Sequence, residues 1–464
     1  MPITIKDLPG PKGIPFLGNS LKLEVNNLHN QLEEWADEYG QIYRLPLFVS
    51  DVVVITEPKI IQHILKDRPE DFIRMKKADK ILREGAVHGV FNAEGEEWKL
   101  HRKMVTKGLD VKHQKAFFDQ MLITVERLYT KWKMDADEGR IIDIQQDFLR
   151  FTVDITTNFA FGYDMNSLEE KGGVVQDHME KIFPMIFKRI NDPIPWYKFL
   201  KNKDDKAYDN ANKEINVYID QFISDARERL ENNPELRENP SNFLEAILLE
   251  VENEEHFGDK EVKGNLMTVL LAGEDTTAHT LAWSIFLLTQ FPESQSKIRS
   301  ESDAILGEDK WINEYEKVAI FKEVEAVANE TMRMRPVAPL LLFEPTSDIE
   351  IEGYAFKEGS LLLVQSRYAA MLEENFSDAK DFKPSRWLRE SKCPVHNNES
   401  YIPFGGGPRF CPGKNLAILE IRLVLSMLLK NFDIEMITPH MDVKEIMAFT
   451  MMASDFKVKL TNRS

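Results

Sequence analysis

The sequence predicts a mainly α-helical fold with small β-sheets, arranged as one large domain over residues 1–464. Apolar side chains recur at helical spacing through most of residues 96–288, whereas short alternating runs occur near the N-terminus and after Asp348. No internal repeat and no linker rich in glycine or serine divides the chain. The 22 glycines and 22 prolines among 464 residues are too few for a fibrous or disordered protein, so the chain is globular.

The charge balance excludes one large class of function. The chain carries 59 lysines and arginines against 77 aspartates and glutamates, which gives a net charge of −18. It contains no dense run of basic residues. Because a surface this acidic repels a phosphate backbone, we expect no nucleic-acid partner.

Cysteine content and hydropathy predict the compartment. Cys393 and Cys411 are the two cysteines of the sequence, so a disulfide scaffold is excluded and a reducing compartment is favoured. The first residues lack the apolar segment of a secretion signal, and no stretch approaches the roughly 18 apolar residues of a membrane-spanning helix. We therefore expect a cytoplasmic protein with no membrane anchor.

The N-terminal region begins with a proline-rich leader over residues 1–20. Its prolines, among them Pro9, Pro11 and Pro15, remove backbone donors and favour extended conformations, so residues 8–15 cannot form a helix. The pattern then predicts a helix over 28–39, strands over 41–45 and 52–55, and a helix over 59–65 that Pro58 begins.

Helices account for nearly all of residues 96–288. Breaks are predicted near Gly162, near Pro193 and Pro195, and in the polar stretch 232–241. A helix is predicted over 261–288, and about 28 residues at 1.5 Å each give ~42 Å, enough to cross the domain. Short antiparallel strands follow Asp348, and one more long helix is predicted over 412–430.

A cysteine in an unusual setting lies within residues 403–413. Cys411 comes directly before the last long helix, where backbone N–H groups and the helix dipole stabilise a thiolate, the form of cysteine that binds a metal. The run Gly405-Gly406-Gly407 permits a tight turn and a close approach to a flat, bulky group. Arg409 can supply a fixed positive charge to a carboxylate on that group.

The pattern Phe404-x-x-Gly407-x-Arg409-x-Cys411-x-Gly413 resembles the haem-binding signature of the cytochrome P-450 family. The resemblance covers nearly the whole chain and is closest to soluble, bacterial-type members. It implies a cytochrome P-450 fold, haem b (iron protoporphyrin IX) as cofactor, and Cys411 as the axial ligand of the iron. It also places Phe404, Gly407 and Arg409 at the haem.

Two further segments are similar to a structural cluster of the family. Glu330 and Arg333 lie three positions apart, so on a helix their side chains share a face and can pair. Arg386, in the segment Phe-Lys-Pro-Ser-Arg-Trp, joins this pair in the family. The resemblance implies a buried cluster of these three side chains behind the cysteine loop, with a structural role.

The predicted helix over 261–288 contains the run Ala-Gly-Glu-Asp-Thr-Thr, similar to the family motif that passes over the oxygen-binding face of the haem. Gly273 destabilises a helix interior by roughly 0.5–1 kcal/mol relative to alanine, and a locally weak helix suits a binding groove. The resemblance implies that Ala272 and Gly273 leave room for dioxygen and substrate. It also implies that Thr276 and Asp275 are catalytic and deliver protons there.

Trp98 and Arg102 are similar to a further haem-binding pair of the family. The two residues lie four positions apart, so they share a helix face, and both side chains can donate to a haem propionate. Phe91, a few residues upstream, is a candidate contact of the substrate pocket.

The segment after Pro336 departs from the family pattern. Many relatives carry an arginine there that meets a haem propionate, but residues 337–343 are wholly apolar in this chain. We therefore expect one propionate to be held differently. The same apolar run, which begins with Val337 and Ala338, is expected to face the substrate pocket, as is Phe449 near the C-terminus.

The resemblance implies a haem-thiolate monooxygenase that inserts one oxygen atom of dioxygen into a C–H bond of a small hydrophobic substrate, such as a fatty acid or terpenoid. Two alternatives stay open: a peroxide-using or non-oxygenating member of the same fold, and a haem-based sensor. A metal site of Cys393, His396 and Cys411 is a third, although its spacing fits no common zinc pattern.

Electrons are expected from a separate ferredoxin or flavodoxin with its reductase, because the chain contains no flavin or nucleotide fingerprint. A local basic patch could steer such an acidic partner. The residues expected to form this patch are Lys99, Arg102, Lys103, Lys107, Lys414 and Arg422.

Overall fold

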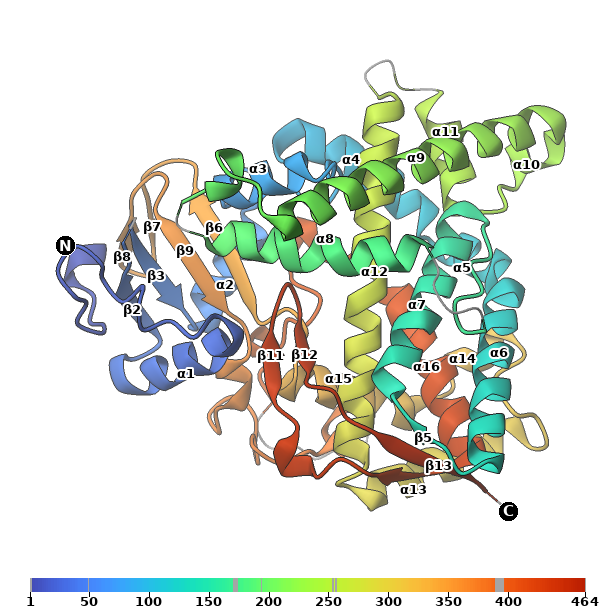
Figure 1. The fold of residues 1–464 in the computed structure, drawn as a ribbon. Helices are drawn as coiled ribbons and strands as arrows, with labels where there is room; N and C mark the ends of the chain where they lie inside the picture. The colour runs from blue at the N-terminus through green and yellow to red at the C-terminus, as the bar shows by residue number, and fades with distance from the viewer. Residues whose placement is uncertain are drawn as a thin grey trace.

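The fold combines a sheet-rich region with a larger helix-rich region. The computed structural model describes residues 2–48, 50–169, 174–192, 194–252, 254, 257–388 and 396–463. In Figure 1 the sheet-rich region, which holds the N-terminus, lies on the left, and helices fill the right side and the top. The predicted fold class, mainly α with small sheets in a single domain, is confirmed.

Helices form most of the structure. Those of the N-terminal half are α1 (Leu28–Tyr39), α2 (Pro58–Lys66), α3 (Lys76–Glu84), α4 (Gly95–Gly108), α5 (Val111–Ala116), α6 (Phe118–Asp137), α7 (Ile144–Phe161), α8 (Val174–Asn191) and α9 (Lys203–Asn232). Those of the C-terminal half are α10 (Pro234–Glu238), α11 (Phe243–Val251), α12 (Asp259–Leu288), α13 (Pro292–Leu306), α14 (Tyr315–Val318), α15 (Lys322–Met334) and α16 (Lys414–Asn431).

Strands of the described residues form small sheets. The largest has the order β2 (Ile42–Pro46), β3 (Asp51–Ile55), β9 (Leu361–Gln365), β6 (Leu340–Pro345) and β4 (Phe72–Arg74). The others are β1 (Ile3–Thr4) with β8 (Tyr354–Phe356) and β7 (Ile349–Ile351); β10 (Phe432–Met436) with β13 (Val458–Asn462) and β5 (Ile141–Ile142); and the hairpin β11 (Glu445–Met447) and β12 (Met451–Ala453). β3 is parallel to β9 and β1 to β8, while the other pairs are antiparallel.

The elements form close to where the sequence predicts them. α1 has the predicted bounds, β2 and β3 cover the two predicted strands, and Pro58 is the first residue of α2. Residues 8–15 of the leader form no helix, and β1 docks the leader on β8. α7 ends before Gly162, α9 ends at Asn232, and α16 covers the last predicted helix.

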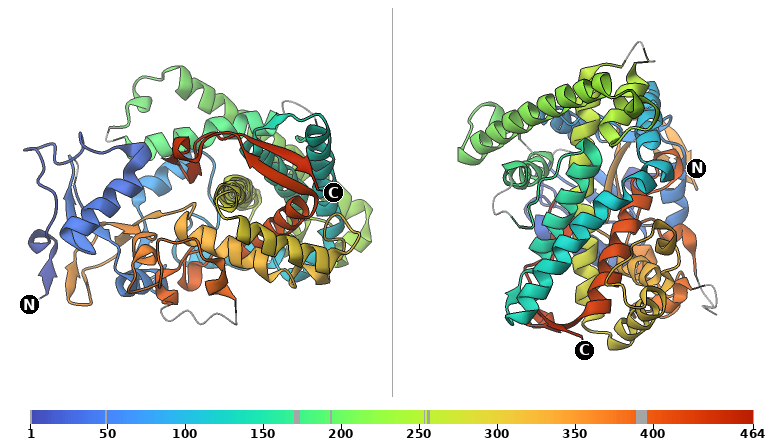
Figure 2. Two further views of the ribbon diagram at one scale, coloured as in Figure 1. Left: turned by 90° about the horizontal axis from the view of Figure 1, so that it is seen from below. Right: turned by 90° about the vertical axis from the view of Figure 1, so that its right-hand side faces the viewer.

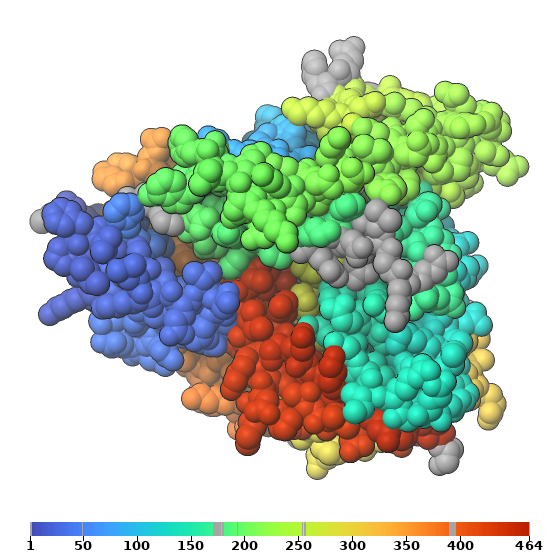
Figure 3. Space-filling view, viewed as in Figure 1, coloured from blue at the N-terminus to red at the C-terminus, as the bar shows by residue number. Residues whose placement is uncertain are grey.

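The C-terminal hairpin closes the seam between the two regions. Figure 3 shows the C-terminal segment at the surface between the N-terminal residues and the helices around α6 and α7. Glu445 of β11 binds His29 of α1 at 2.7 Å, Arg367 at 2.8 Å and Arg335 at 2.9 Å. Burial alone would raise the pKa of Glu445, but these three partners hold it well below its usual range. The hairpin is therefore tied to both regions by charge.

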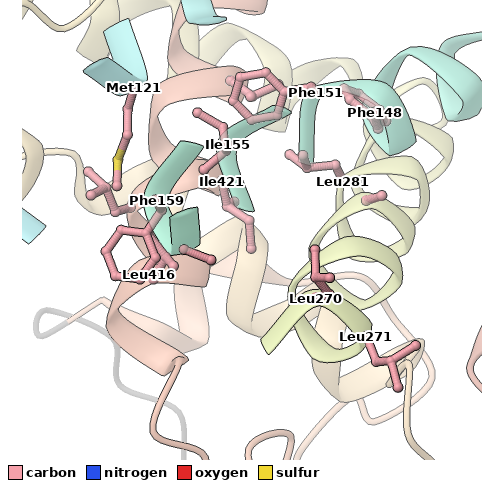
Figure 4. Packing of buried hydrophobic residues seen from close by; sticks show 14 of the residues in the cluster. Met121, Phe148, Phe151, Ile155, Phe159, Leu270, Leu271, Leu281, Leu416 and Ile421 are labelled. Atoms are coloured by element: carbon pink, nitrogen blue, oxygen red, sulfur yellow. The ribbon is translucent and has the colours of Figure 1, made fainter. Parts of the chain in front are cut away.

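α12 is the axis of the helix-rich region. The left view of Figure 2 looks along this helix, and other elements surround it. α12 packs against α7 and α16, whose apolar side chains meet in one core with those of α6 (Figure 4). The helix begins two residues earlier than predicted and ends where predicted.

Gly273 lies at a close contact between α12 and α7. α12 runs unbroken through this residue. A Cβ at this position would lie 2.6 Å from Oγ1 and 2.9 Å from Cγ2 of Thr156 on α7. Thr152 of α7 also donates to the Glu274 carbonyl at 2.9 Å. Glycine at 273 therefore allows the close contact of two core helices.

The side chains of Glu330, Arg333 and Arg386 form the ion cluster that the sequence predicts. The Glu330 carboxylate binds Arg333 at 2.9 Å and Arg386 at 3.0 Å, and all three side chains are fully buried. Trp387 Nε1 donates to the same carboxylate at 2.8 Å. The remaining donors of Arg333 reach the carbonyls of Ala370 and Ala379. The cluster fixes the segment that precedes residues 403–413 against α15.

Among the helices of the described residues, none is both long enough and apolar enough to cross a membrane.

Candidate functional site

Cys411 lies half-buried at the start of α16. Its N–H donates to the Phe404 carbonyl at 2.9 Å, which closes the loop over residues 404–411. Burial raises the pKa of the Cys411 thiol, whereas the N–H groups of Gly413 and Lys414 and the charges of Arg102 and Lys414 lower it. The sulfur is thus surrounded by donors suited to an anion, but burial keeps it protonated unless a cation binds it. This is the environment of a metal ligand.

The loop before Cys411 is pressed against α2. Gly407 has a φ of 62°, and a Cβ there would lie 2.1 Å from the Leu65 carbonyl oxygen. No larger residue fits this position, so the glycine sets the path of the loop. The ring of Phe404 is half-buried, with the ammonium of Lys414 5.7 Å from its centre.

Three arginines converge on one carboxylate beside this loop. Glu94 binds Arg409 through one oxygen and Arg68, at 3.1 Å, through the other. The same second oxygen accepts the backbone N–H of Arg74 at 2.8 Å. Arg74 and Arg409 both donate to the Phe91 carbonyl, at 3.1 and 3.3 Å. Burial and the charge of Arg68 lower the pKa of Arg409 to about 9 and that of Arg74 to about 10, so both stay protonated at neutral pH.

This arginine cluster (Arg68, Arg74, Arg409) has more positive charge than its partners neutralise. The cluster shares one Glu94 carboxylate, and Asp79, which attracts Arg74 at longer range, is itself bound by Arg83. The Nε atoms of Arg68 and Arg74 are buried and have no hydrogen-bond partner among the described residues. Such a site fits a ligand with two negative charges.

Sequence reasoning found Arg409 but missed Arg68, Arg74 and Glu94. The segment after Pro336 lacks an arginine, but other arginines are present in this cluster. Arg68 comes from the connection between α2 and β4, and Arg74 comes from β4. A weak signal was present, since two arginines flank the apolar strand of β4.

The side chains of Trp98 and Arg102, both on α4, contact different groups. Trp98 is buried, and the guanidinium of Arg409 lies 5.1 Å from the centre of its ring. Arg102 instead donates to the Phe410 carbonyl at 2.6 Å and attracts the Cys411 sulfur. One residue therefore supports the arginine cluster and the other supports the cysteine.

α12 presents an exposed stretch halfway along its length. Ala272 is exposed and Thr276 is half-buried. Leu271 and Glu274, which point in other directions from the helix, are buried. Thr276 Oγ1 donates to the Ala272 carbonyl at 2.8 Å. Asp275, next to Thr276, is half-buried.

Aromatic rings from three distant segments meet near this stretch. The ring centre of Phe449, in the turn between β11 and β12, lies 5.2 Å from that of Phe183 on α8 and 6.4 Å from that of Phe91. His279 of α12 holds the turn by a 3.1 Å hydrogen bond to Thr450. Burial lowers the pKa of His279 to about 4, so this ring is neutral. We name Phe91, Phe183 and Phe449 the aromatic cluster.

Only the first part of the apolar run over 337–343 lies next to the turn between β11 and β12. The Val337 carbonyl accepts the N–H of Met451 at 2.8 Å, which ties this end of the run to the hairpin, and Ala338 is exposed. From Leu340 onward the run is strand β6, and Phe343 is buried in the sheet core with Arg68 over its ring. The expectation that the whole run faces the pocket fails at Phe343, because its ring is packed in the sheet core.

The surroundings of His396 do not support the alternative metal site of Cys393, His396 and Cys411. Cys393 lies outside the described residues. The His396 ring packs between those of Phe376 and Trp387, at 4.8 and 4.7 Å between centres.

Comparisons with known proteins agree with the geometry. The family model described as cytochrome P-450 matches residues 8–460. Tabersonine 16-hydroxylase 1 of Catharanthus roseus is 28% identical over 96% of this chain and 90% of its own length. Protein LUTEIN DEFICIENT 5, a chloroplastic protein of Arabidopsis thaliana, is 27% identical over 92% of this chain and 73% of its own length. A self-sufficient cytochrome P-450 monooxygenase of Phanerodontia chrysosporium is 25% identical over 97% of this chain and 42% of its own length.

Members of this family bind haem b through a cysteine thiolate, and the residues of this chain fit that group. The half-buried sulfur of Cys411 needs a cation, and the arginine cluster, with unpartnered buried Nε atoms, needs anions such as the two propionates. Local chemistry and a match over nearly the whole sequence thus lead to one conclusion: the chain belongs to the cytochrome P-450 family and is a haem-thiolate monooxygenase.

Proposed function

We propose that the enzyme inserts one oxygen atom of dioxygen into a C–H bond of a small hydrophobic substrate, such as a fatty acid or terpenoid. The observation that carries this proposal lies within residues 403–413, where a half-buried cysteine at a helix N-terminus stands two residues from an arginine of the charged cluster. Among the relatives, the tabersonine 16-hydroxylase is named for hydroxylation of a small organic molecule.

Haem b, when bound, supplies the activation of dioxygen and the removal of hydrogen from the substrate. The chain holds and orients this group. Cys411 provides the sulfur ligand, and the N–H groups of Gly413 and Lys414 stabilise its negative charge. The arginine cluster binds the propionates, with Trp98 supporting Arg409 from α4. Phe404 and Gly407 shape the loop that carries the ligand.

Thr276 and Asp275 handle protons in this proposal. The Thr276 hydroxyl donates to the Ala272 carbonyl, so its oxygen keeps the capacity to accept a hydrogen bond from water. Asp275, the neighbouring half-buried carboxyl group, can exchange protons with solvent. An enzyme that takes peroxide needs no such supply of protons, so the presence of both residues favours dioxygen as the oxidant.

The substrate class follows from the aromatic cluster. Phe91, Phe183 and Phe449 come from a loop, a helix and a hairpin turn. Phe449 contacts both of the other rings, and the Arg74 guanidinium lies 3.9 Å from the centre of the Phe91 ring. We infer that Val337 and the exposed Ala338 extend this surface, because the Val337 carbonyl accepts the N–H of Met451, two residues after Phe449. Such a surface gains free energy from apolar ligands and offers few hydrogen bonds to polar ones.

We propose that electrons come from a separate ferredoxin or flavodoxin with its reductase. The expected basic patch is weaker than its composition suggests, because four of its cations have carboxylate partners. Lys99 binds Glu96, Lys103 binds Glu254, Lys107 binds Glu250, and Arg422 binds Glu325. Lys414 and Arg102, which flank Cys411, are the cations that support docking near the thiolate.

We propose a cytoplasmic location for the enzyme. The support is the low cysteine content, which suits a reducing compartment. The relatives include chloroplastic proteins, so detection of the native protein in an organelle or membrane fraction would overturn this assignment.

Substitution Cys411→Ala tests the assignment of the ligand. The reduced carbon-monoxide complex of the wild-type enzyme should show the strongly red-shifted Soret band of thiolate ligation. We expect the variant to lose that band and all oxidation, because no other group replaces the sulfur. Cys393→Ala, which removes the other cysteine, should keep both. A variant at 411 that retains the band would show that another residue is the ligand.

Substitution Arg74→Leu tests the role of the arginine cluster. A charge-assisted hydrogen bond contributes about 1.5–3 kcal/mol, so we expect haem to transfer to apomyoglobin roughly ten- to a hundredfold faster. The control is Arg44→Leu, which removes a half-exposed arginine bound to Asp51 in the sheet-rich region. Equal transfer rates for the two variants would contradict propionate binding by Arg74.

Substitution Thr276→Ala tests proton handling. We expect normal haem content and continued consumption of reductant from a surrogate ferredoxin system, but less product and several-fold more hydrogen peroxide. Thr276→Ser, which keeps the hydroxyl, should restore coupling. Thr268→Ala is a second control, because Thr268 makes the same bond to the carbonyl four residues earlier. Unchanged coupling in Thr276→Ala would remove this residue from the proton path.

Substitution Phe449→Ala tests the substrate class. Loss of an aromatic pair costs about 0.5–1.5 kcal/mol beyond the buried area, so we expect a medium-chain fatty acid or a monoterpene to bind roughly three- to tenfold more weakly. The measurement is the ferric spin-state shift during titration. Phe16→Ala, at a ring that is 94% exposed, serves as control. The proposal fails if neither apolar ligand shifts the wild-type spectrum.

A further inference from the structure

Residues 88–90, in the segment between α3 and α4, lie directly against α12. A Cβ at Gly264 of α12 would lie 1.8 Å from the His88 carbonyl oxygen. A Cβ at Gly89 would lie 2.7 Å from Oδ1 of Asn265. The two backbones therefore meet without side chains between them, and Asn265 stands fully buried at this contact.

Both polar atoms of the Asn265 side chain are used at this contact. Oδ1 accepts the N–H of Val90 at 2.9 Å. Nδ2 donates to the Glu261 carbonyl, one turn earlier on α12, at 3.1 Å. It also lies 2.7 Å from Nδ1 of His101 on α4. A single amide group therefore joins α12, α4 and the segment that carries Val90.

Two backbone partners fix the orientation of this amide. If its oxygen and nitrogen exchanged places, an N–H group would face the N–H of Val90 and the oxygen would face the Glu261 carbonyl. Neither backbone group can change its protonation, so only the observed orientation satisfies both. Nδ2 then donates to Nδ1 of His101, which makes this imidazole neutral with its proton on Nε2. Burial lowers the pKa of His101, against the attraction of Glu97 and Glu261, in agreement with a neutral ring.

Val90 connects Asn265 to the proposed haem and substrate sites. The N–H of Val90 is held by Asn265, and its carbonyl accepts a hydrogen bond from Arg409 at 3.3 Å. Phe91, the next residue, offers Arg409 a second carbonyl at 3.3 Å. The ring of Phe91 belongs to the aromatic cluster, with its centre 6.4 Å from that of Phe449. A contact on α12 thus lies one residue away from groups that meet Arg409 and Phe449.

We propose that Asn265 is a positioning residue for both haem and substrate. It acts through Val90 and Phe91, which it fixes on α12 so that their carbonyls meet Arg409 and the Phe91 ring meets the aromatic cluster. Without Asn265 the buried N–H of Val90 would lack a partner, and the segment would have to shift to find one. This inference rests on the proposed assignment of Arg409 to a propionate and of Phe91 to the substrate.

Substitution Asn265→Leu in the haem-loaded full chain removes the bond to Val90 at similar side-chain volume. The reduced carbon-monoxide complex should keep its thiolate band, because Cys411 is untouched. We expect a medium-chain fatty acid or a monoterpene to bind about three- to tenfold more weakly in the ferric spin-state titration, and haem to transfer to apomyoglobin about three- to tenfold faster. Asn265→Asp keeps an oxygen for the N–H of Val90, so it should recover most of both losses.

Thr268→Ala is the matched control. Thr268 follows Asn265 by three positions on α12 and is also buried beside Gly89, but its hydroxyl donates within its own helix, to the Gly264 carbonyl. This variant should match the wild type in both measurements. Equal values for Asn265→Leu and Thr268→Ala would overturn the proposal.

The tautomer of His101 gives an independent readout. In ¹⁵N-histidine spectra of the diamagnetic ferrous carbon-monoxide complex, with His101→Gln for assignment, the wild-type ring should carry its proton on Nε2. In Asn265→Asp the carboxylate can only accept, so the proton should move to Nδ1. A wild-type proton on Nδ1 would contradict the proposal, because the amide would then turn its oxygen away from Val90. If the Nε2 tautomer is found but no apolar ligand shifts the wild-type spectrum, the proposed substrate class fails and haem transfer decides the role of Asn265.

Discussion

The negative charge of one sulfur atom constrains the rest of the structure. A thiolate at Cys411 is stable only where donors and cations surround it, because burial alone favours the neutral thiol. The start of α16 supplies two N–H groups, α4 supplies Arg102, and the path of the loop depends on Gly407 against α2. Each of these elements must be in position before the sulfur can act as a ligand.

The core around α16 and α12 provides that position. Both helices are buried along most of their length, and a polar contact joins them. Burial raises the pKa of Glu420 on α16 well above its usual range, against the opposing effect of a hydrogen bond with Thr277 on α12. This side-chain contact links the helix that follows Cys411 to the helix that carries Thr276. Glu330 on α15 is also buried, but there one carboxylate binds two guanidinium groups, those of Arg333 and Arg386.

Sequence reasoning found the residues whose identity is set by chemistry and missed those whose role depends on contacts. Cys411, Arg409 and Glu330 stand in short motifs, and Glu330 binds the two arginines that the sequence assigns to it. Arg68 and Arg74 belong to no such motif, because their role comes from meeting Glu94 across a break between elements. A single sequence does not show that Thr156 of α7 lies against Gly273, because that contact joins two separate helices. Nor does it show that Phe343 packs in the sheet core, because the pairing of β6 with β9 and β4 joins distant segments.

The segment between α3 and α4 connects all three parts of the site. Glu94 at its end binds the arginine cluster, and Phe91 contributes both a ring to the aromatic cluster and a carbonyl to Arg409. The carbonyl of Ala93 accepts a further bond from Arg409, at 2.7 Å. The carbonyls that hold Arg409 and the ring of Phe91 lie on one short stretch of backbone. In the proposed assignment of the arginine cluster to the propionates and of Phe91 to the substrate, a shift of residues 85–94 would therefore change haem retention and substrate affinity together.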